Sequence, residues 1–224
     1  MTFVELNAEV MACRRCPRLL AWREQVAREK RRAFRDQEYW GRPVPGFGDP
    51  RARVLVVGLA PGAHGSNRTG RMFTGDGSGD FLYPALYRAG FASQPEARFR
   101  ADGLVLKDLY ITAVCRCAPP GNKPTPQEMA NCRPYLEREV ELIHPKVFVA
   151  LGRIAFDAIK SILHAPVSIA FSHNAASHLE TSQPGAEHWL LASYHPSRQN
   201  TQTGRLTAEM FDQVWLKARG LLER

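Results

Sequence analysis

Cysteines at two widely separated places in the chain have a spacing that suits metal binding. Cys13 and Cys16 form a C-x-x-C pair, and Cys117 and Cys132 lie far along the chain. Two thiolates spaced in this way can reach one metal, and four suit either a structural zinc or an iron–sulfur cluster. A zinc ribbon usually has two close pairs, whereas Cys117 and Cys132 are not close in sequence. The spacing therefore favours a [4Fe–4S] cluster.

Cys115 is a fifth cysteine, two residues before Cys117. If the residues before it form a strand, both side chains point to the same side, so spacing does not choose between them. The alternative is that some cysteines are small buried core residues. We consider that alternative less plausible than metal binding for the C-x-x-C pair, and more plausible for Cys115.

A second candidate is the glycine-rich stretch 58–76, GLAPGAHGSNRTGRMFTGD. Glycine has no Cβ, so such a loop lets its backbone approach a ligand closely. The stretch also carries an aromatic residue, Phe73, and an acid, Asp76. Asp76 is either a functional acid or a turn and capping residue, and both interpretations stand at this point. Neither G-x-G-x-x-G nor G-x-x-x-x-G-K-S/T occurs, which disfavours a nucleotide-phosphate loop.

His195 follows the apolar run 189–193 and precedes a polar loop. A histidine at such a place can donate a hydrogen bond to an anion that forms on a leaving group. A lone histidine is more often an ordinary surface or core residue. Its position at a strand end, with Pro196, Ser197 and the polar loop behind it, favours a functional role.

These residues need a scaffold, and the apolar pattern predicts one. Strands are expected at 54–57, 104–114, 147–151 and 189–193, and helices at 3–12, 19–35, from Ser78 or Asp80, 125–143, 152–163 and from Thr207. Strands that alternate with helices predict a parallel sheet between helical layers. Ligands bind at the carboxyl ends of such strands, so the loops after 57, 117 and 193 should meet. Pro134 should break or kink its helix, and 39–50 and 164–185 should be irregular.

Length and charge narrow the class of protein. The 224 residues, 44% of them hydrophobic, are enough for one domain with a core. A net charge of +8 and a pI of about 9.5 favour a polyanionic partner, with nucleic acid first. No run is long and apolar enough to span a membrane, and the N-terminus lacks the pattern of a secretory signal. We therefore expect a cytoplasmic protein.

The stretch at 58–76, the cysteine set, CAPPGNKPTP from Cys117 and YHPSRQNTQTGRLT from Tyr194 together resemble the uracil-DNA glycosylase superfamily. The match is to its iron–sulfur B-type branch, called family 5, and it covers most of the chain. The resemblance implies a three-layer α/β/α fold with a four-stranded parallel sheet. It implies one domain over 1–224, with an N-terminal helical segment, residues 1 to about 45, tied on by the metal cluster.

The resemblance also implies a function. Such an enzyme hydrolyses the N-glycosidic bond of uracil and other deaminated bases, such as hypoxanthine, in double-stranded DNA. We expect a monomer with a [4Fe–4S] cofactor. No lysine stands out as a Schiff-base nucleophile, since Lys123 is better explained as a phosphate contact. A monofunctional enzyme that leaves an abasic site is therefore expected. The alternative is a non-catalytic nucleic-acid-binding protein with a structural metal site.

Roles for individual residues follow in part from the same resemblance and in part from the residue types. Phe73 would stack on a flipped base, and the loop 196–205 would enter the minor groove. The candidate catalytic residues are Asp76, Asn122 and His195. The candidate base-binding residues are Gly58, Ala60, Gly62, Phe73 and Ala113. The candidate DNA-contacting residues are Arg68, Ser197, Arg198, Gln199, Asn200 and Arg205. The candidate metal ligands are Cys13, Cys16, Cys117 and Cys132. Arg14, Arg15 and Arg116 are expected near the metal, within reach of phosphates.

Two departures from the superfamily pattern affect the expected chemistry. Ala60 stands where the best-known branch has an aspartate, and Leu59 stands where the A-type branch has a glutamate. The usual carboxylate that activates water is thus missing, so Asp76 is the leading candidate for that role and Asn122 the second. Ala113 replaces an asparagine that reads uracil in the A-type branch, which predicts a broader range of substrates.

Overall fold

The computed structural model describes residues 2–180 and 187–224, and within them one mixed sheet runs through the molecule. Its strands follow the order β1-β3-β2-β4-β6-β5. Their bounds are β1 Phe47–Gly48, β2 Val54–Gly58, β3 Leu109–Ala113, β4 Val147–Leu151, β5 Ala176–Glu180 and β6 Glu187–Ser193. The four central strands are parallel, which confirms the predicted parallel core.

The two outer strands are a correction to the predicted four-stranded sheet. Both pair antiparallel, β1 with β3 and β5 with β6. β1 lies in the stretch 39–50 expected to be irregular, and with two residues it is too short to show an alternating pattern. β5 lies in 164–185, also expected to be irregular, of which 181–186 fall outside the described residues. Its sequence ASHLE is largely polar because it covers an edge, so apolar content does not mark it.

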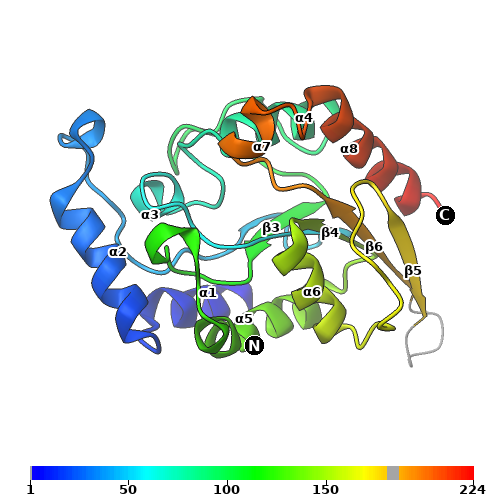
Figure 1. Ribbon diagram of the computed structural model, residues 1–224, viewed down its shortest axis with the longest axis horizontal. Coiled ribbons are helices and arrows are strands. Elements are labelled where there is room, and N and C mark those ends of the chain that lie inside the picture. Colours follow the sequence, from blue (N-terminus) through cyan, green and yellow to red (C-terminus); the bar gives the residue numbers. More distant parts are fainter. Residues whose placement is uncertain (1, 181–186) are drawn as a thin grey trace.

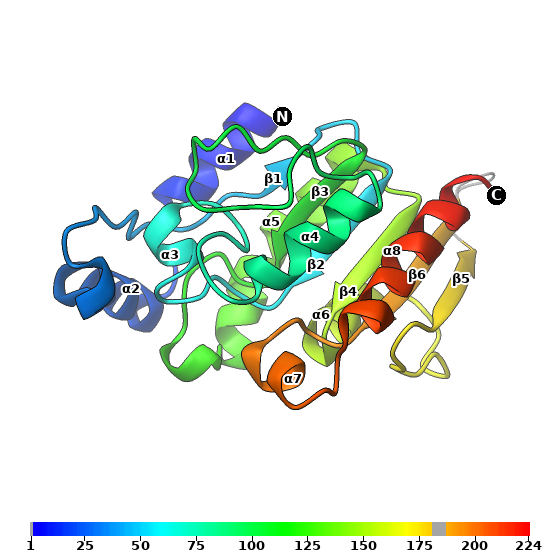
Figure 2. The same ribbon diagram turned by 90° about the horizontal axis from the view of Figure 1, so that it is seen from above.

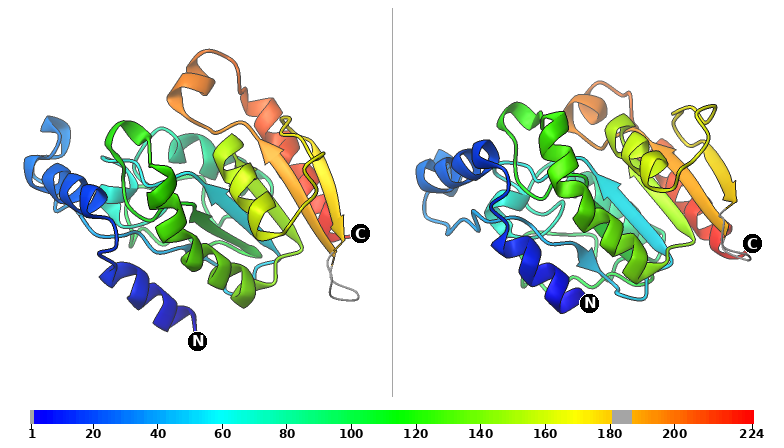
Figure 3. Two further views of the ribbon diagram at one scale, coloured as in Figure 1. Left: turned by 60° about the horizontal axis from the view of Figure 1, so that its bottom comes forward. Right: turned by 90° about the horizontal axis from the view of Figure 1, so that it is seen from below.

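Helices cover both faces of the sheet. Figure 1 shows α4 and α8 above it and α1, α5 and α6 below, and Figure 3 presents the lower layer from two directions. The helices are α1 Phe3–Ala12, α2 Pro17–Glu29, α3 Ser66–Thr69, α4 Gly79–Arg88, α5 Pro126–Ile143, α6 Arg153–Ile162, α7 Arg198–Gln202 and α8 Ala208–Leu222. Short 3₁₀ turns occur at Arg32–Phe34 and Pro120–Asn122. The three predicted layers are therefore present.

Strand β2 divides the core in two. Val54 and Val56 belong to the cluster that includes Trp215 of α8, whereas Leu55 and Val57 belong to the cluster on the α5 side. All five residues of β2 are buried. Successive side chains of a strand point to opposite faces, so a continuous apolar run is what a strand covered on both sides requires.

Two helix predictions need correction. Helix α5 runs unbroken past Pro134, because the proline costs one hydrogen bond and the carbonyl that loses it, on Ala130, belongs to an exposed residue that water can reach. Helix α2 ends at Glu29 rather than Arg35, since Lys30 takes a positive φ of 53° that stops it. Thr125 begins α5 with the expected cap, completed by Glu128 as a capping box.

The N-terminal helices are bonded to the body of the protein. Glu9 of α1 pairs with Arg138 of α5, and Arg18 of α2 pairs with Glu128 at 2.6 Å. The side chain of Asn67 donates to the carbonyl of Arg23 at 3.3 Å, which joins α2 to α3. Among the described residues, no helix is long and apolar enough to cross a membrane.

Candidate active site and cysteine pocket

The carboxyl ends of the parallel strands carry most of the predicted site residues. Gly58 ends β2 and lies opposite Ala113, the last residue of β3. A Cβ on Gly58 would lie 2.7 Å from Cζ of Phe73, so the absence of a side chain lets the Phe73 ring pack on the strand end. Figure 2 shows α3 and α7 beyond this same end of the strands. The sheet thus brings together loops that are far apart in sequence.

Phe73 and His195 are neighbours in this region. Their ring centroids are 5.8 Å apart with planes inclined by 31°, within the range of about 4.5–7 Å for rings in direct contact. Phe73 is only 8% exposed and has a positive φ of 51°, which is uncommon for an aromatic residue. A planar ligand has no room between the two rings, so it must lie along their accessible edges or displace one of them.

The loop after β6 fixes the position of His195. Its carbonyl accepts a hydrogen bond from Nδ2 of Asn200 at 2.8 Å, and the Ser197 side chain accepts from the backbone N–H of Asn200. Ser197 is the N-cap of α7. Burial lowers the pKa of His195 to about 4, because the charged imidazolium is poorly solvated there. The ring is therefore neutral at neutral pH and offers one N–H donor.

Asp76 lies in the same loop system and uses its two carboxylate oxygens differently. Oδ1 accepts hydrogen bonds from the N–H groups of Ser78 at 3.0 Å and Gly79 at 3.2 Å, which holds the start of α4. Oδ2 faces the glycine loop, where a Cβ on Gly65 would meet it at 1.8 Å. Burial raises the pKa of Asp76, and the two N–H bonds and the charge of Arg68 oppose that rise.

Arg68 is placed differently from the prediction that it contacts DNA. It is only 9% exposed, and its guanidinium donates to the carbonyls of His64 and Gly75 and to Gln37. It also stacks over the Phe34 ring at 4.0 Å. Its contacts therefore hold the glycine loop together. The sequence alone does not show whether an arginine in a polar loop bonds to the loop itself or binds phosphate.

Asn122 lies at the same edge but apart from the two rings. It is exposed, it has a positive φ of 57°, and it ends the 3₁₀ turn after β3. Among the described residues, no hydrogen bond or ring contact joins it to Asp76 or His195. Ala60 and Gly62 are half-buried in the glycine loop, and a Cβ on Gly62 would lie 2.8 Å from Oδ2 of Asp76.

The α7 loop presents polar side chains next to the glycine loop. Arg198 and Gln199 are exposed, and a Cβ on Gly77 would lie 2.8 Å from Nε of Arg198. Arg205 is exposed and its guanidinium lies 4.7 Å from the centre of the Tyr194 ring. These cations therefore stand at the rim around Asp76 and His195.

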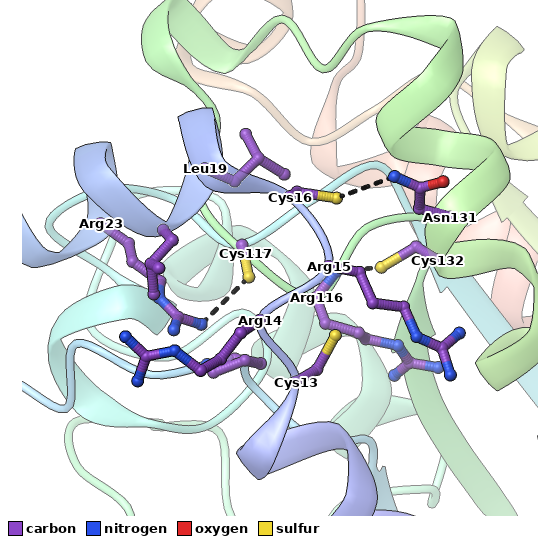
Figure 4. Close-up of a pocket in the computed structure, with 12 residues that line it drawn as sticks. Cys13, Arg14, Arg15, Cys16, Leu19, Arg23, Arg116, Cys117, Asn131 and Cys132 are labelled. Atoms are coloured by element: carbon purple, nitrogen blue, oxygen red, sulfur yellow. Dashed lines mark hydrogen bonds between the residues drawn. The ribbon is translucent and has the colours of Figure 1, made fainter.

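Four cysteines from three parts of the chain line one pocket, shown in Figure 4. They are Cys13, Cys16, Cys117 and Cys132. All five cysteines of the chain are free thiols. Cys115 does not line the pocket, and it is buried and hydrogen-bonded to the sulfur of Cys132. The spacing alone did not choose between Cys115 and Cys117 as a ligand. The structure favours Cys117, because it lines the pocket and Cys115 does not.

Hydrogen-bond donors point at three of the four sulfurs. Nη1 of Arg23 lies 3.3 Å from the sulfur of Cys117, and Nδ2 of Asn131 lies 3.5 Å from that of Cys16. The backbone N–H of residue 116 donates to the sulfur of Cys132 at 3.3 Å. Such donors stabilise thiolates, as metal ligation requires.

The thiols differ in their electrostatics. The hydrogen bond from Cys115 and the nearby Arg116 charge lower the pKa of Cys132 to about 7, whereas burial raises the pKa of Cys117 to about 12. Within the described ranges, no three His, Cys, Asp or Glu side chains are grouped closely enough to hold a metal ion. A four-iron cluster is larger than a single ion, so its thiolates stand further apart than the ligands of one zinc. The donor set fits a cluster on chemical grounds.

Arg116 lines the cysteine pocket, as expected, but the expectation that it touches phosphates is wrong. It is 1% exposed, and its guanidinium pairs with Glu139, which is completely buried. Arg14 and Arg15 do line the cysteine pocket, as expected. Sequence reasoning missed Arg23 and Asn131. The spacing of Arg23 from Leu19 and Val26, both buried in α2, is the signal that would have placed it on the inner face.

Comparisons with known proteins show similarity over most of the chain. The family model described as "Uracil DNA glycosylase superfamily" matches residues 45–219. A protein of Thermus thermophilus named "Type-5 uracil-DNA glycosylase" is 58% identical over 212 residues, covering 94% of each chain. A protein of Mycobacterium leprae with the same name is 52% identical over 219 residues, covering 97% of this chain and 94% of its own. One from Pyrobaculum aerophilum, also so named, is 46% identical over 206 residues, covering 92% and 87%.

The close approach of Asp76 to the glycine loop predicts a stability difference between two glycine substitutions. Gly65→Ala should lower the free energy of unfolding by about 1–3 kcal/mol, because its Cβ overlaps Oδ2, Cγ and Cβ of Asp76. Gly220→Ala should raise it by about 0.5–1 kcal/mol, because residue 220 is in α8 and its Cβ would meet nothing within 4 Å. Urea unfolding measures both. Equal effects of the two substitutions would contradict the packing of Asp76.

Proposed function

The chain belongs to the uracil DNA glycosylase superfamily and to its type-5 branch, and on that premise we propose that it hydrolyses the N-glycosidic bond of uracil in double-stranded DNA. We extend the proposal to other deaminated bases, such as hypoxanthine, and to a monofunctional reaction that leaves an abasic site. The observation that carries it is the contact of Phe73 with His195 at the carboxyl edge of the sheet, beside the glycine loop. One chain supplies every residue involved, so the monomer is the proposed active unit.

Base recognition begins with extrusion, since the glycosidic bond cannot be reached inside the duplex. Phe73 would contact the flipped base with the accessible part of its ring. Ala113 offers only a methyl group at the end of β3, so no side-chain amide there selects uracil over other deaminated bases. A pocket without a matched polar partner discriminates weakly between bases, which supports the broader substrate range.

Departure of the base leaves negative charge on it and positive charge on the sugar. His195 is neutral at neutral pH and can donate its one N–H to the base anion as a hydrogen bond. One such donor typically contributes about 3 kcal/mol, or roughly 10²–10³ in rate. Backbone N–H groups of the glycine loop are the other proposed donors.

Asp76 is the proposed residue that positions the attacking water. Leu59 and Ala60 cannot accept a proton, whereas the Asp76 carboxylate keeps Oδ2 directed at the glycine loop while Oδ1 holds α4. Because burial raises its pKa, the carboxylate is a stronger base than one in water. Its anchoring to Ser78 and Gly79 keeps it in one orientation.

The DNA would contact the rim formed by the α7 loop. Arg198, Gln199 and Arg205 are exposed there, and Ser197 and Asn200 hold the loop in shape. The net charge of +8 favours binding to phosphates. The basic residues in and after α2 add further positive charge that can attract phosphates.

We also propose that Cys13, Cys16, Cys117 and Cys132 hold a [4Fe–4S] cluster. When bound, the cluster would act as a structural link between the N-terminal helices and the end of β3. The support is the shared pocket and the N–H donors at three of its sulfurs. Cys115 is not among the proposed ligands.

The proposed activity is tested on duplexes that carry one uracil or one hypoxanthine. Incubation followed by alkali should break the strand at the modified base, and omission of alkali should leave it intact. Borohydride should trap no covalent adduct, since no lysine serves as a nucleophile. An intact strand after alkali would exclude a glycosylase, and a trapped adduct would exclude the monofunctional reaction.

Asp76→Asn should slow single-turnover excision of uracil by at least about 10²-fold at saturating enzyme, the scale of a lost general base. The amide keeps an oxygen for the N–H groups of Ser78 and Gly79, so unfolding by urea should change little. Rates equal to those of the unmodified protein would remove Asp76 from the mechanism.

The low pKa of His195 predicts how excision depends on pH. Because that pKa is about 4, the ring stays neutral as the pH passes through 6.5, the ordinary histidine value. The single-turnover rate should show no His195 titration there, and the ratio of unmodified to His195→Gln rates should be constant across neutral pH. The rate should fall in acid as Asp76, whose pKa is raised, becomes protonated. A step near 6.5 that His195→Gln abolishes would contradict this assignment.

The cluster proposal predicts a contrast between two neighbouring cysteines. Cys117→Ser should lower the bound iron and the visible absorbance of protein purified without oxygen, because it removes a ligand. Cys115→Ser should retain both, because that side chain lies outside the pocket. Iron analysis and absorbance spectra measure the result. Loss of iron in Cys115→Ser with retention in Cys117→Ser would reverse the ligand assignment.

A further inference from the structure

A second groove adjoins the cysteine pocket and shares Cys13, Arg14 and Arg23 with it. Its volume is about 330 Å³, at the lower end of the range of about 300–1,000 Å³ for ligand pockets. It is formed by the junction between α1 and α2 together with the segment after Tyr39. The charged residues that line it are Arg14, Arg23, Glu24 and Arg42.

The charged side chains that line the groove carry a net positive charge. Three guanidinium groups face one carboxylate, and that carboxylate, on Glu24, is 4.0 Å from Nη2 of Arg23. In the described part of the chain, Arg14 has no hydrogen bond or ion pair, and Arg42 has only a stacking contact with Trp40 at 5.7 Å. Such an arrangement of arginines suits an anion with several oxygen acceptors.

Arg23 is the buried member of this set. It is 4% exposed, and it lines both the groove and the cysteine pocket. Nη1 is used by the sulfur of Cys117, but Nε has no hydrogen-bond partner within the described residues. A buried guanidinium nitrogen without an acceptor costs free energy, which a bound anion near it would relieve. Figure 4 shows Arg14 and Arg23 on the same side of the pocket.

Asn67 joins the groove to the glycine loop. Its carbonyl accepts from the N–H of Gly41 at 3.0 Å, and its Nδ2 donates to the carbonyl of Arg23 at 3.3 Å. The same Nδ2 lies 3.4 Å from the carbonyl of Ala63, within the glycine loop. Asn67 is fully buried. Both walls of the groove are thus held in a fixed position relative to the loop that carries Phe73 and Asp76.

We propose that this groove binds a phosphate of the DNA backbone and so sets the register of the duplex on the enzyme. The inference rests on the proposed function and deepens it, because it adds a contact point outside the α7 loop. Guanidinium groups bind phosphate oxygens through paired, charge-assisted hydrogen bonds. The phosphate would lie between Arg14 and Arg42, above Arg23. The contacts of Asn67 with Arg23 and Gly41 would hold the walls of this site in place.

The test uses binding of an undamaged duplex as a function of salt. Arg42→Gln and Arg14→Gln should each weaken binding about tenfold at low salt, the scale of one lost charge-assisted hydrogen bond. Each should also reduce the slope of log K against log salt by about 1. Arg51→Gln is the matched control, since Arg51 is exposed before the amino end of β2, at the opposite edge. Slopes like that of the unmodified protein, or an equal loss in Arg51→Gln, would overturn the proposal.

Two further measurements separate the possible outcomes. Single-turnover excision at saturating enzyme should be unchanged in the control Arg51→Gln, and the visible absorbance of Arg42→Gln, which lies outside the cysteine stretch, should match that of the unmodified protein. If the unmodified protein excised no uracil, the proposed function would fail, while duplex binding would still decide the groove. If inorganic phosphate bound only to the unmodified protein and all variants bound duplex equally, the groove would take free phosphate, and the proposal would be wrong.

Discussion

The site depends on the contact between one half-buried carboxylate, that of Asp76, and the glycine backbone of the loop before it. Asp76 fills space that a Cβ on Gly65 would occupy, and its other oxygen holds the first turn of α4. A Cβ on Gly79 would meet the carbonyl of Phe73 at 1.8 Å, so the start of α4 also presses on the aromatic residue. Asp76, Phe73 and the glycine loop therefore form one packed unit. A charge that is partly withdrawn from water is stabilised by directed N–H groups, here those of Ser78 and Gly79.

The region around the cysteines is organised by arginines that point inward. Arg23 and Arg116 are both buried, one bonded to a cysteine sulfur and the other paired with Glu139. Removing charges from water costs several kcal/mol for each ion, so such groups are retained only where partners are well placed. Arg116 is anchored by its side chain to α5, while its backbone N–H reaches Cys132. The end of β3 and helix α5 are thereby held in one arrangement.

The sequence predicted the parallel core and the positions of most site residues, because fully buried strands are apolar runs and loops that follow them meet at one edge. It did not predict β1 or β5, since a short strand and a polar edge strand lack the alternating pattern. It also expected Arg68 and Arg116 to contact DNA, whereas both have internal partners, and it missed Arg23, which is buried against a sulfur. The residue type of an arginine does not show whether its partners lie inside the protein. For Asp76, the interpretations as a functional acid and as a capping residue are compatible. One carboxylate oxygen holds the start of α4, and the other faces the glycine loop.

The contacts of the N-terminal helices bear on how the four thiols come together. On one side of the Cys13–Cys16 pair, Glu9 holds Arg138, and on the other side Arg18 holds Glu128. Neither contact involves sulfur, and Asn67 adds a third attachment through Arg23. Contacts within the polypeptide therefore bring the four thiols together without the proposed cluster. Small zinc-dependent domains differ, since they fold only when the ion binds.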